Sequence, residues 1–250
     1  IVATATGSLS TPASVAATSV GSRAQGAKTV AGTSNGAVTI KSGGVLTVSQ
    51  AIVTTPGGAD TAGGTVVLEA VGGITTQTSG TITTDGSGNA AGGEVLLANA
   101  TSGNITIGKA ISAQGGSSGT PGTASDGGVV TLINAGGNIV LNEAINVSKN
   151  AAGTNDGTIQ LKASGDITDD ANGNLVANGN GLVNAVSTGG KIVLDRNDAI
   201  VTDGHSVAKV SLETSGTGGD RSIVFHEASA LEVIVATATG SLSTPASVAA

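Results

Sequence analysis

The sequence predicts an all-β protein: a single-chain parallel β-helix, or β-solenoid, with three short strands per coil and little or no helix. Three observations predict it: an unusual composition, a long exact repeat, and short alternating apolar segments that recur along the chain. Glycine fills 41 of 250 positions, charged residues only 11%, and Phe225 is the single aromatic residue. Glycine takes the positive φ angles of tight corners without steric cost, and narrow stacked coils leave little room for large rings.

The same composition argues against several functional classes. Cys is absent, which excludes a disulfide framework, a redox thiol and a Cys-based zinc site. A net charge of −7 with ten scattered Lys and Arg disfavours nucleic acid, which needs clustered cations. No apolar run reaches the roughly 18 residues of a membrane span. The sequence starts at Ile1 with no recognisable targeting signal, so we expect an internal segment of a longer protein.

A long repeat gives the domain organisation. Residues 1–17 and 234–250 both read IVATATGSLSTPASVAA, so the second copy begins 233 residues after the first. We interpret 1–233 as one tandem β-solenoid unit and 234–250 as the start of the next identical unit; an artificial duplication is the alternative. In tandem units the two copies would adopt one conformation, and the IVATAT strand would pair with the preceding coil near residues 223–225.

Within the unit, a first series of strands is predicted by alternating segments: AVTI, TVVL, EVLL, VVTL, TIQL, KIVL and KVSL. Their last apolar residues are spaced by 28, 29, 35, 29, 33 and 18 residues. Alternation with a period of two predicts strands with one buried face. Together with the strands described next, they give an inward set of Val66, Leu68, Val95, Leu97, Ile105, Ile107, Ile111, Val130, Leu132, Ile139, Leu141, Ile145, Ile159, Leu161, Ile192 and Leu194.

Two further strands and a loop complete each coil. VVTLINA is followed by GGNIVLN and EAINVS, EVLLANA by SGNITIG and KAISA, and TVVLEA by VGGITT and GTITT. Polar loops at 54–62, 84–91, 114–126 and 148–156 then return the chain to the next coil. Stacked repeats of this kind are typical of solenoids. A disordered low-complexity tract is the alternative, but such tracts lack recurring apolar alternation.

The segments GGNIVLNEAINVS, GTIQLKASGDIT and SGNITIGKAISAQGG resemble the coils of filamentous-haemagglutinin-like secreted adhesins, the large exoproteins of two-partner secretion. The resemblance covers most of residues 36–215 and is a pattern, not a signature motif. It implies a right-handed β-helix on an extracellular fibre, and it transfers no functional residue to this chain.

Paired carboxylates are the first candidates for chemistry, because glycoside-cleaving enzymes commonly use two across a cleft. The candidates are Asp166 with Asp169 and Asp170, and Asp195 with Asp198, which lie close to Arg196. Asp and Asn are also frequent in corners, where they bond nearby backbone groups. We therefore expect structural corners here and no catalytic residue.

Metal ligands are the second candidates. His205 and His226 could bind a metal as a pair, but no third ligand follows at a recognisable spacing, and we expect solvated loop or edge histidines. Asp170, Asn172 and Asn174 start an EF-hand pattern, yet Leu175 stands where Gly is required and Gly181 where Glu is required. The sequence therefore predicts no metal and no cofactor. Three N-x-[ST] sequons offer glycosylation acceptors, a question that the sequence leaves open, at Asn99, Asn104 and Asn146.

These observations favour a structural function: a secreted fibre or surface stalk of tandem near-identical units, located outside the cell. Its expected partners are copies of the same repeat placed end to end, with other fibres or a cell surface as further partners. The alternative is an adhesin whose stacked loops bind a host or cell-surface partner. A more remote alternative is a β-helix enzyme that acts on polysaccharides.

Overall fold

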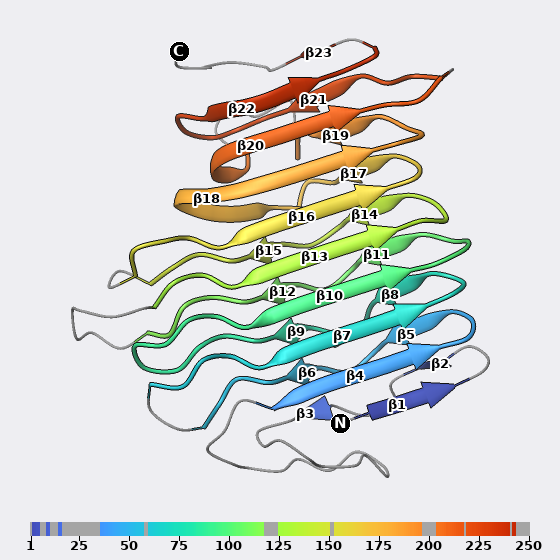
Figure 1. Ribbon diagram of the computed structural model, residues 1–250. Helices are drawn as coiled ribbons and strands as arrows, with labels where there is room; N and C mark the ends of the chain where they lie inside the picture. Colours follow the sequence, from blue (N-terminus) through green and yellow to red (C-terminus); the bar gives the residue numbers. More distant parts are fainter. Residues whose placement is uncertain are drawn as a thin grey trace.

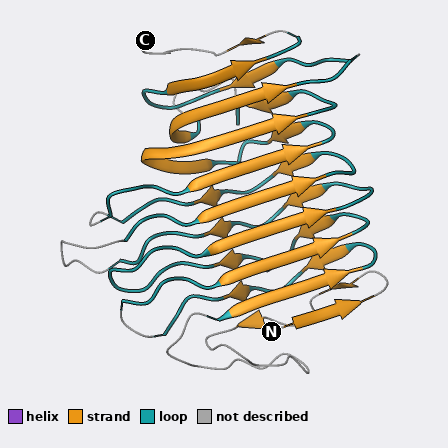
Figure 2. Cartoon of the chain, viewed as in Figure 1, coloured by secondary structure: helices purple, strands orange, loops and turns teal. Residues whose placement is uncertain are grey.

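The computed structural model describes the backbone of residues 2–5, 9–10, 15–16, 36–57, 60–117, 125–150, 153–196, 204–217, 219–240 and 242–243, and side chains from residue 36 to 240 within these ranges. Every regular element in this part of the chain is a β strand (Figure 2). None of it forms a helix long and apolar enough to cross a membrane. The all-β prediction is therefore confirmed.

The first five coils carry one long and two short strands each, and all the strand pairings of the described residues are parallel. The long strands are β1 (Val2–Ala5), β4 (Ala37–Ser42), β7 (Thr65–Ala70), β10 (Glu94–Asn99), β13 (Val129–Asn134), β16 (Thr158–Ala163), β18 (Leu175–Ser187), β20 (Ser206–Thr214) and β22 (Glu232–Thr237). A second sheet contains β2 (Leu9–Ser10), β5 (Leu46–Val48), β8 (Ile74–Thr76), β11 (Ile105–Ile107), β14 (Ile139–Leu141), β17 (Ile167–Asp169), β19 (Ile192–Leu194), β21 (Ile223–Phe225) and β23 (Leu242–Ser243). The third strands are β3 (Val15–Ala16), β6 (Ile52–Val53), β9 (Ile82–Thr83), β12 (Ile111–Ser112) and β15 (Ile145–Asn146).

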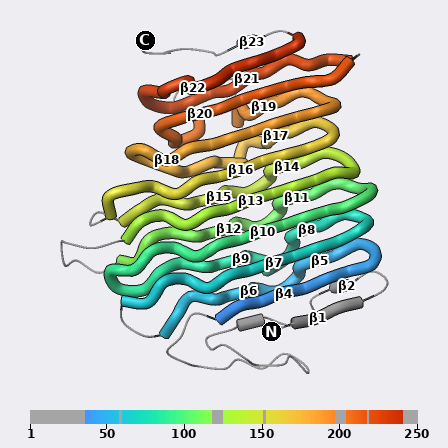
Figure 3. Tube along the Cα trace, in the orientation of Figure 1, coloured from blue at the N-terminus to red at the C-terminus, as the bar shows by residue number. Residues whose placement is uncertain are grey.

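The coils stack into a single parallel β-helix. In Figure 1 the long strands run from left to right at the front, the short strands return behind them, and the chain climbs toward its C-terminus. This path is a right-handed turn, and the tube in Figure 3 traces the same stacking. Parallel strands joined by crossovers take this hand almost without exception.

The interior consists of aliphatic columns along the helix axis. All sixteen residues expected to face inward are buried. Ladder partners stack like on like: Leu97 lies between Leu68 and Leu132, and Ile105 lies between Ile74 and Ile139. Burying a Leu or Ile side chain stabilises a fold by roughly 1.5–3 kcal/mol, so these columns are the main source of cohesion between coils.

Glycine is required where successive coils touch at the corner before the second sheet. Gly103 has a φ of +82°, and a Cβ on it would lie 2.2 Å from the carbonyl oxygen of Gly72 in the preceding coil. Any larger residue would push the two corners apart. This close approach explains part of the high glycine content.

Three expectations need correction. The short strands have three and two residues, fewer than the four to six expected, because corners occupy the rest. Ile192 and Leu194 belong to the second sheet, since the long strand of that coil is the end of β18. The IVATAT segment pairs through β22 with Ser211–Glu213 of β20, and not near residues 223–225. Each strand pairs with the strand of the same sheet one coil away. β22 therefore pairs with β20, and β21 of the second sheet pairs with β23.

The ladder register links equivalent positions of the 233-residue repeat. In the long-strand sheet, eight pairing steps connect two valines at the same repeat position, through Val2, Thr39, Val67, Leu96, Thr131, Gln160, Asn184, Ser211 and Val235. In the second sheet, eight steps connect two leucines, through Leu9, Leu46, Ile74, Ile105, Ile139, Ile167, Ile192, Ile223 and Leu242. The repeat length therefore equals a whole number of coils in both sheets.

Candidate functional site

Of the carboxylate candidates, Asp166 lies at the corner that precedes the second sheet, whereas Asp169, Asp170 and Asp195 lie at or just after the ends of second-sheet strands. The N–H of Asn138 donates to Asn104 Oδ1 at 3.0 Å, that of Asp166 to Asn138 Oδ1 at 2.8 Å, and that of Lys191 to Asp166 Oδ1 at 2.9 Å. Each side chain thus accepts the backbone N–H at the equivalent position of the next coil. Asp166 is one step of this ladder, as expected for a residue that caps a corner.

Asp169 occupies a position that is aliphatic in the two preceding coils. It is the ladder partner of Leu141, which in turn pairs with Ile107, and its side chain is fully buried. Its Oδ1 accepts the N–H of Asp195 at 3.1 Å, and its Oδ2 accepts that of Arg196 at 3.0 Å. A buried carboxylate is stable only with such partners.

His205 lies in contact with Asp169. Its Nε2 lies 3.3 Å from Asp169 Oδ2, and its Nδ1 accepts the N–H of Leu175 at 3.2 Å. Because Nδ1 accepts a hydrogen bond, the imidazole carries its proton on Nε2, which faces the carboxylate. The ring also packs against Phe225, with centroids 5.1 Å apart.

Both histidines are buried, so the expectation of solvated histidines is wrong. His205 is 0% exposed and His226 3%. The cause is tertiary: the His205 ring lies between Asp169 and Phe225, and its backbone N–H donates to the carbonyl of His226 at 2.9 Å. Local sequence around either histidine gives no sign of this contact.

Glu227 extends this polar cluster. Both of its carboxylate oxygens accept the N–H of Val207, at 3.1 and 3.0 Å, and its Oε1 also accepts a hydrogen bond from Ser229 Oγ at 3.0 Å. Burial raises the pKa of Glu227 to about 7, although these hydrogen bonds favour the ionised form and act in the opposite direction. No sequence motif points to Glu227.

Arg196 closes the cluster toward the corner. Its backbone has a φ of +49°, its Nη1 donates to the carbonyl of Gly204 at 3.1 Å, and its Nη2 donates to that of Ala171 at 3.3 Å. The guanidinium therefore holds two chain segments together. Asp198, the expected partner of Asp195, lies outside the described residues.

The side chains of Asp166, Asp169 and Asp170 all accept hydrogen bonds from backbone N–H groups. Asp169 is enclosed, Asp166 bonds the next coil, and Asp170 accepts the N–H of Asn172 at 2.9 Å in a local turn. A general acid or nucleophile must reach a substrate, which an enclosed carboxylate cannot do. This arrangement of Asp166, Asp169 and Asp170 can lock neighbouring coils together.

The EF-hand-like segment is also a turn. After it, Leu175 is buried and begins β18, so the chain extends where a calcium loop would have to curl. Among the described residues, no group of three or more His, Asp or Glu side chains is placed to hold a metal ion.

Of the three sequons, Asn99 is placed inside the protein. It is 2% exposed, and its Nδ2 donates to Asn134 Oδ1 at 2.8 Å. This buried asparagine pair was missed, although EVLLANA and VVTLINA both carry Asn two residues after the last inward Leu. Asn104 is exposed and Asn146 half-buried.

No protein-family model matches this sequence, and neither the curated proteins nor the solved structures include a significant match to it.

Proposed function

We propose that this chain is a unit of an elongated structural fibre or surface stalk, located outside the cell and built from tandem copies of a 233-residue β-solenoid repeat. The support is that the sequence repeat and the register of the strand ladders agree. Residues 1–17 and 234–250 are identical, and two independent ladders each connect equivalent residues through eight coils.

This agreement is the observation that carries the proposal. Individual coils differ widely in length: Thr39 follows its partner Val2 by 37 residues, whereas Asn184 follows Gln160 by 24. With such unequal coils, an arbitrary repeat would place its second copy at a different ladder position. A repeat that closes on whole coils lets the next unit continue both sheets without a register fault.

The energetics suit a fibre. Each coil contacts its neighbours along the axis, so stability is a sum of coil and interface contributions and grows with the number of units. A net charge of −7 per unit also keeps an extended chain soluble. Each added unit then makes the fibre longer.

An adhesin is the second candidate, because in the coils from β4 to β16 the variation in length is concentrated at one edge. There the corner after each long strand varies by only two residues, while the connection between third and long strands varies by six. Loops carried on a rigid scaffold commonly provide binding surfaces. The resemblance to filamentous-haemagglutinin-like adhesins favours the same alternative and a secreted location.

We also propose that the chain acts without catalysing a reaction, since the best acid candidates, Asp166 and Asp169, bond backbone groups. Purified chain incubated with a panel of polysaccharides tests this. Turnover that is lost in the Asp169→Asn and Asp170→Asn double variant would favour the enzyme hypothesis.

The decisive test of the fibre is a length measurement. Chains with one, two and three units, examined by small-angle scattering and electron microscopy, should lengthen by roughly 40 Å per unit, from eight coils at about 4.8 Å. A matched pair of deletions checks the register: removal of residues 65–93 takes out one whole coil, because Thr65 and Glu94 are ladder partners. Removal of 65–78 takes out about half a coil and should destabilise the chain. Two-unit chains that do not lengthen would overturn the proposal.

The location is tested separately. Antibodies raised against this chain should label intact cells that produce the parent protein as strongly as permeabilised ones. Labelling only after permeabilisation would contradict the extracellular assignment.

A further inference from the structure

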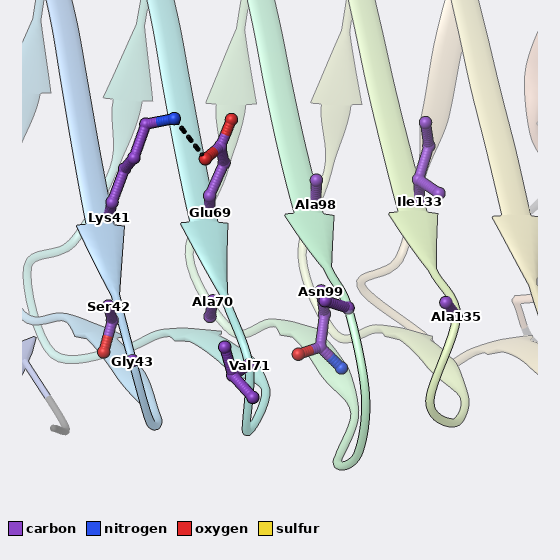
Figure 4. A pocket seen from close by; sticks show the side chains of 11 residues that line it. Lys41, Ser42, Gly43, Glu69, Ala70, Val71, Ala98, Asn99, Ile133 and Ala135 are labelled. Carbon is purple, nitrogen blue, oxygen red and sulfur yellow. Dashed lines mark ion pairs between the residues drawn. The ribbon is translucent and has the colours of Figure 1, made fainter. Parts of the chain in front are cut away.

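The open face of the long-strand sheet carries a row of residues with an ordered pattern of size and charge. Along the axis the row reads Lys41, Glu69, Ala98, Ile133 and Lys162, each the ladder partner of the next. Figure 4 shows the first four on the same side of the sheet. We call this row the 41–162 row.

The middle of the row combines a hollow with a projecting side chain. Ala98 stands between Glu69 and Ile133, and a shallow hollow of about 710 Å³, lined mainly by apolar atoms, lies over it and extends to Val71. Ile133 is 38% exposed and Val71 41%, although both are large apolar residues. An exposed apolar side chain beside an apolar hollow is a typical feature of a binding surface.

Charges flank this apolar centre with opposite signs. On one side, Lys41 Nζ contacts Glu69 Oε2 at 2.7 Å, and both side chains are 40% or more exposed. On the other side, Lys162 is exposed. The row therefore presents an acid one step before Ala98, at the rim of the hollow, and a base one step after the projecting Ile133.

We propose that this face binds the same face of a second copy of the chain, with the two helix axes antiparallel. A two-fold axis parallel to the strands, passing between β10 and β13, reverses the order of the row. It places Ile133 of each copy over the Ala98 hollow of the other, and Glu69 opposite Lys162 of the second copy. The same two-fold axis therefore matches both the sizes and the charges of the facing side chains, as an interface between two identical surfaces requires.

The proposed contact is small. Five strands at about 4.8 Å and six residues at about 3.3 Å span on the order of 500 Å² per copy, so roughly 1,000 Å² is buried in total. Interfaces of this size are at the lower limit of stable association, and we expect a weak dimer for one unit. The inference is independent of the fibre; if units do occur in tandem, repeated faces would strengthen the contact by avidity.

Charge reversal provides a specific test. Glu69→Lys and Lys162→Glu should each abolish self-association, measured by sedimentation equilibrium up to about 1 mM, because each variant opposes like charges twice in its own dimer. An equimolar mixture of the two variants should associate again, as a heterodimer with two restored pairs. The two positions are three ladder steps apart, roughly 14 Å, so the recovery cannot arise within one chain.

Two more variants complete the experiment. Ile133→Asp should abolish association by removing the projecting side chain, and circular dichroism should show an unchanged β spectrum. Lys109→Glu, on a corner away from this face, should leave association unchanged even though it loses the ion pair with Glu143. A wild-type chain that stays monomeric at 1 mM, or a mixture of variants that does not associate, would overturn the proposal; neither result depends on the length of tandem chains.

Discussion

The interior is packed differently in the coils before β17 and in the coils after it. In the earlier coils the interior is a set of aliphatic columns, such as Leu68, Leu97 and Leu132. In the later coils an inward position is taken by Asp169, His205 is buried beside it, and Glu227 and His226 are also buried. Apolar columns need no specific partner beyond similar neighbours, whereas the polar cluster needs each of its members.

The coils on the two sides of β17 also differ in length. Asn184 follows its ladder partner by only 24 residues, and the third strand of that coil merges with the next long strand in β18. The shortened path bends at residues 178–180, and Ala185 stands where Leu161 and Leu212 stand in the neighbouring coils. Phe225 and His205, which stack on each other, fill the interior of these irregular coils.

The largest loss of stability is expected in the coils before β17, which we call the regular region. Leu132→Asp places a charge in a closed aliphatic column, and it should lower the free energy of unfolding by several kcal/mol, measured by urea denaturation. Thr131→Asp, on the outward face of the same strand, should cost about 1 kcal/mol or less. Equal effects for the two variants would show that the inward assignment does not govern stability.

The next largest effect is expected in the polar cluster. His205→Leu removes the imidazole beside the buried Asp169 carboxylate and leaves the Leu175 N–H without its acceptor, and it should cost about 3–5 kcal/mol. Asp169→Leu alone should also destabilise the chain, since two N–H groups lose their acceptor. The double variant should cost clearly less than the sum of the two, by a double-mutant cycle. Strict additivity would contradict the proposed coupling.

These two regions also differ in how well the sequence predicts them. The columns were predictable because alternation is local: every residue from Val66 to Leu161 in the inward set is recognised within its own segment. The placement of Ile192 in the long series failed because Val183 and Ala185 give a weaker signal than IVL. The burial of His205 could not be predicted, since Asp169 lies 36 residues away and no spacing rule links them.

A partial signal for the cluster was nevertheless present. In the second sheet, ITD follows ITI and IVL, so a polar residue interrupts an aliphatic position. Within a stacked fold, an interruption of that kind indicates a buried polar contact, but it does not name the partner. Contacts of this type depend on the packing of distant coils, which is why propensity and pattern cannot supply them.

A moderate effect is expected at the buried asparagine pair of the regular region. Asn134→Leu leaves Asn99 Nδ2 without its acceptor at Asn134 Oδ1, and it leaves the Gly136 N–H unpaired. The expected cost is about 1–3 kcal/mol in urea denaturation. Asn155→Ala, which removes an exposed contact to Asp126, should cost less than half as much. A neutral Asn134 variant would mean that solvent reaches this corner.

The smallest effect concerns Glu227 and pH. Because burial raises its pKa from 4.5 to about 7, the folded protein holds a proton between these values that the unfolded chain releases. Its contribution to stability is therefore fully present below about pH 4.5, declines as the pH rises, and is lost above about pH 7. Asp126 acts in the opposite sense at lower pH, because the Asn155 N–H lowers its pKa from 3.8.

The measurement is the urea midpoint of wild type and Glu227→Gln at intervals from pH 5 to 8.5. The difference between the two should change by a small amount in favour of the variant as the pH rises, since Gln carries no ionisable proton and cannot become a buried charge. Glu232→Gln, at an exposed carboxylate that pairs with Lys209 at 3.3 Å, serves as the control and should shift the curve without changing its slope. Parallel curves for wild type and Glu227→Gln would contradict the raised pKa. They would also imply that the hydrogen bonds from Val207 and Ser229 outweigh burial and hold the Glu227 carboxylate ionised across this pH range.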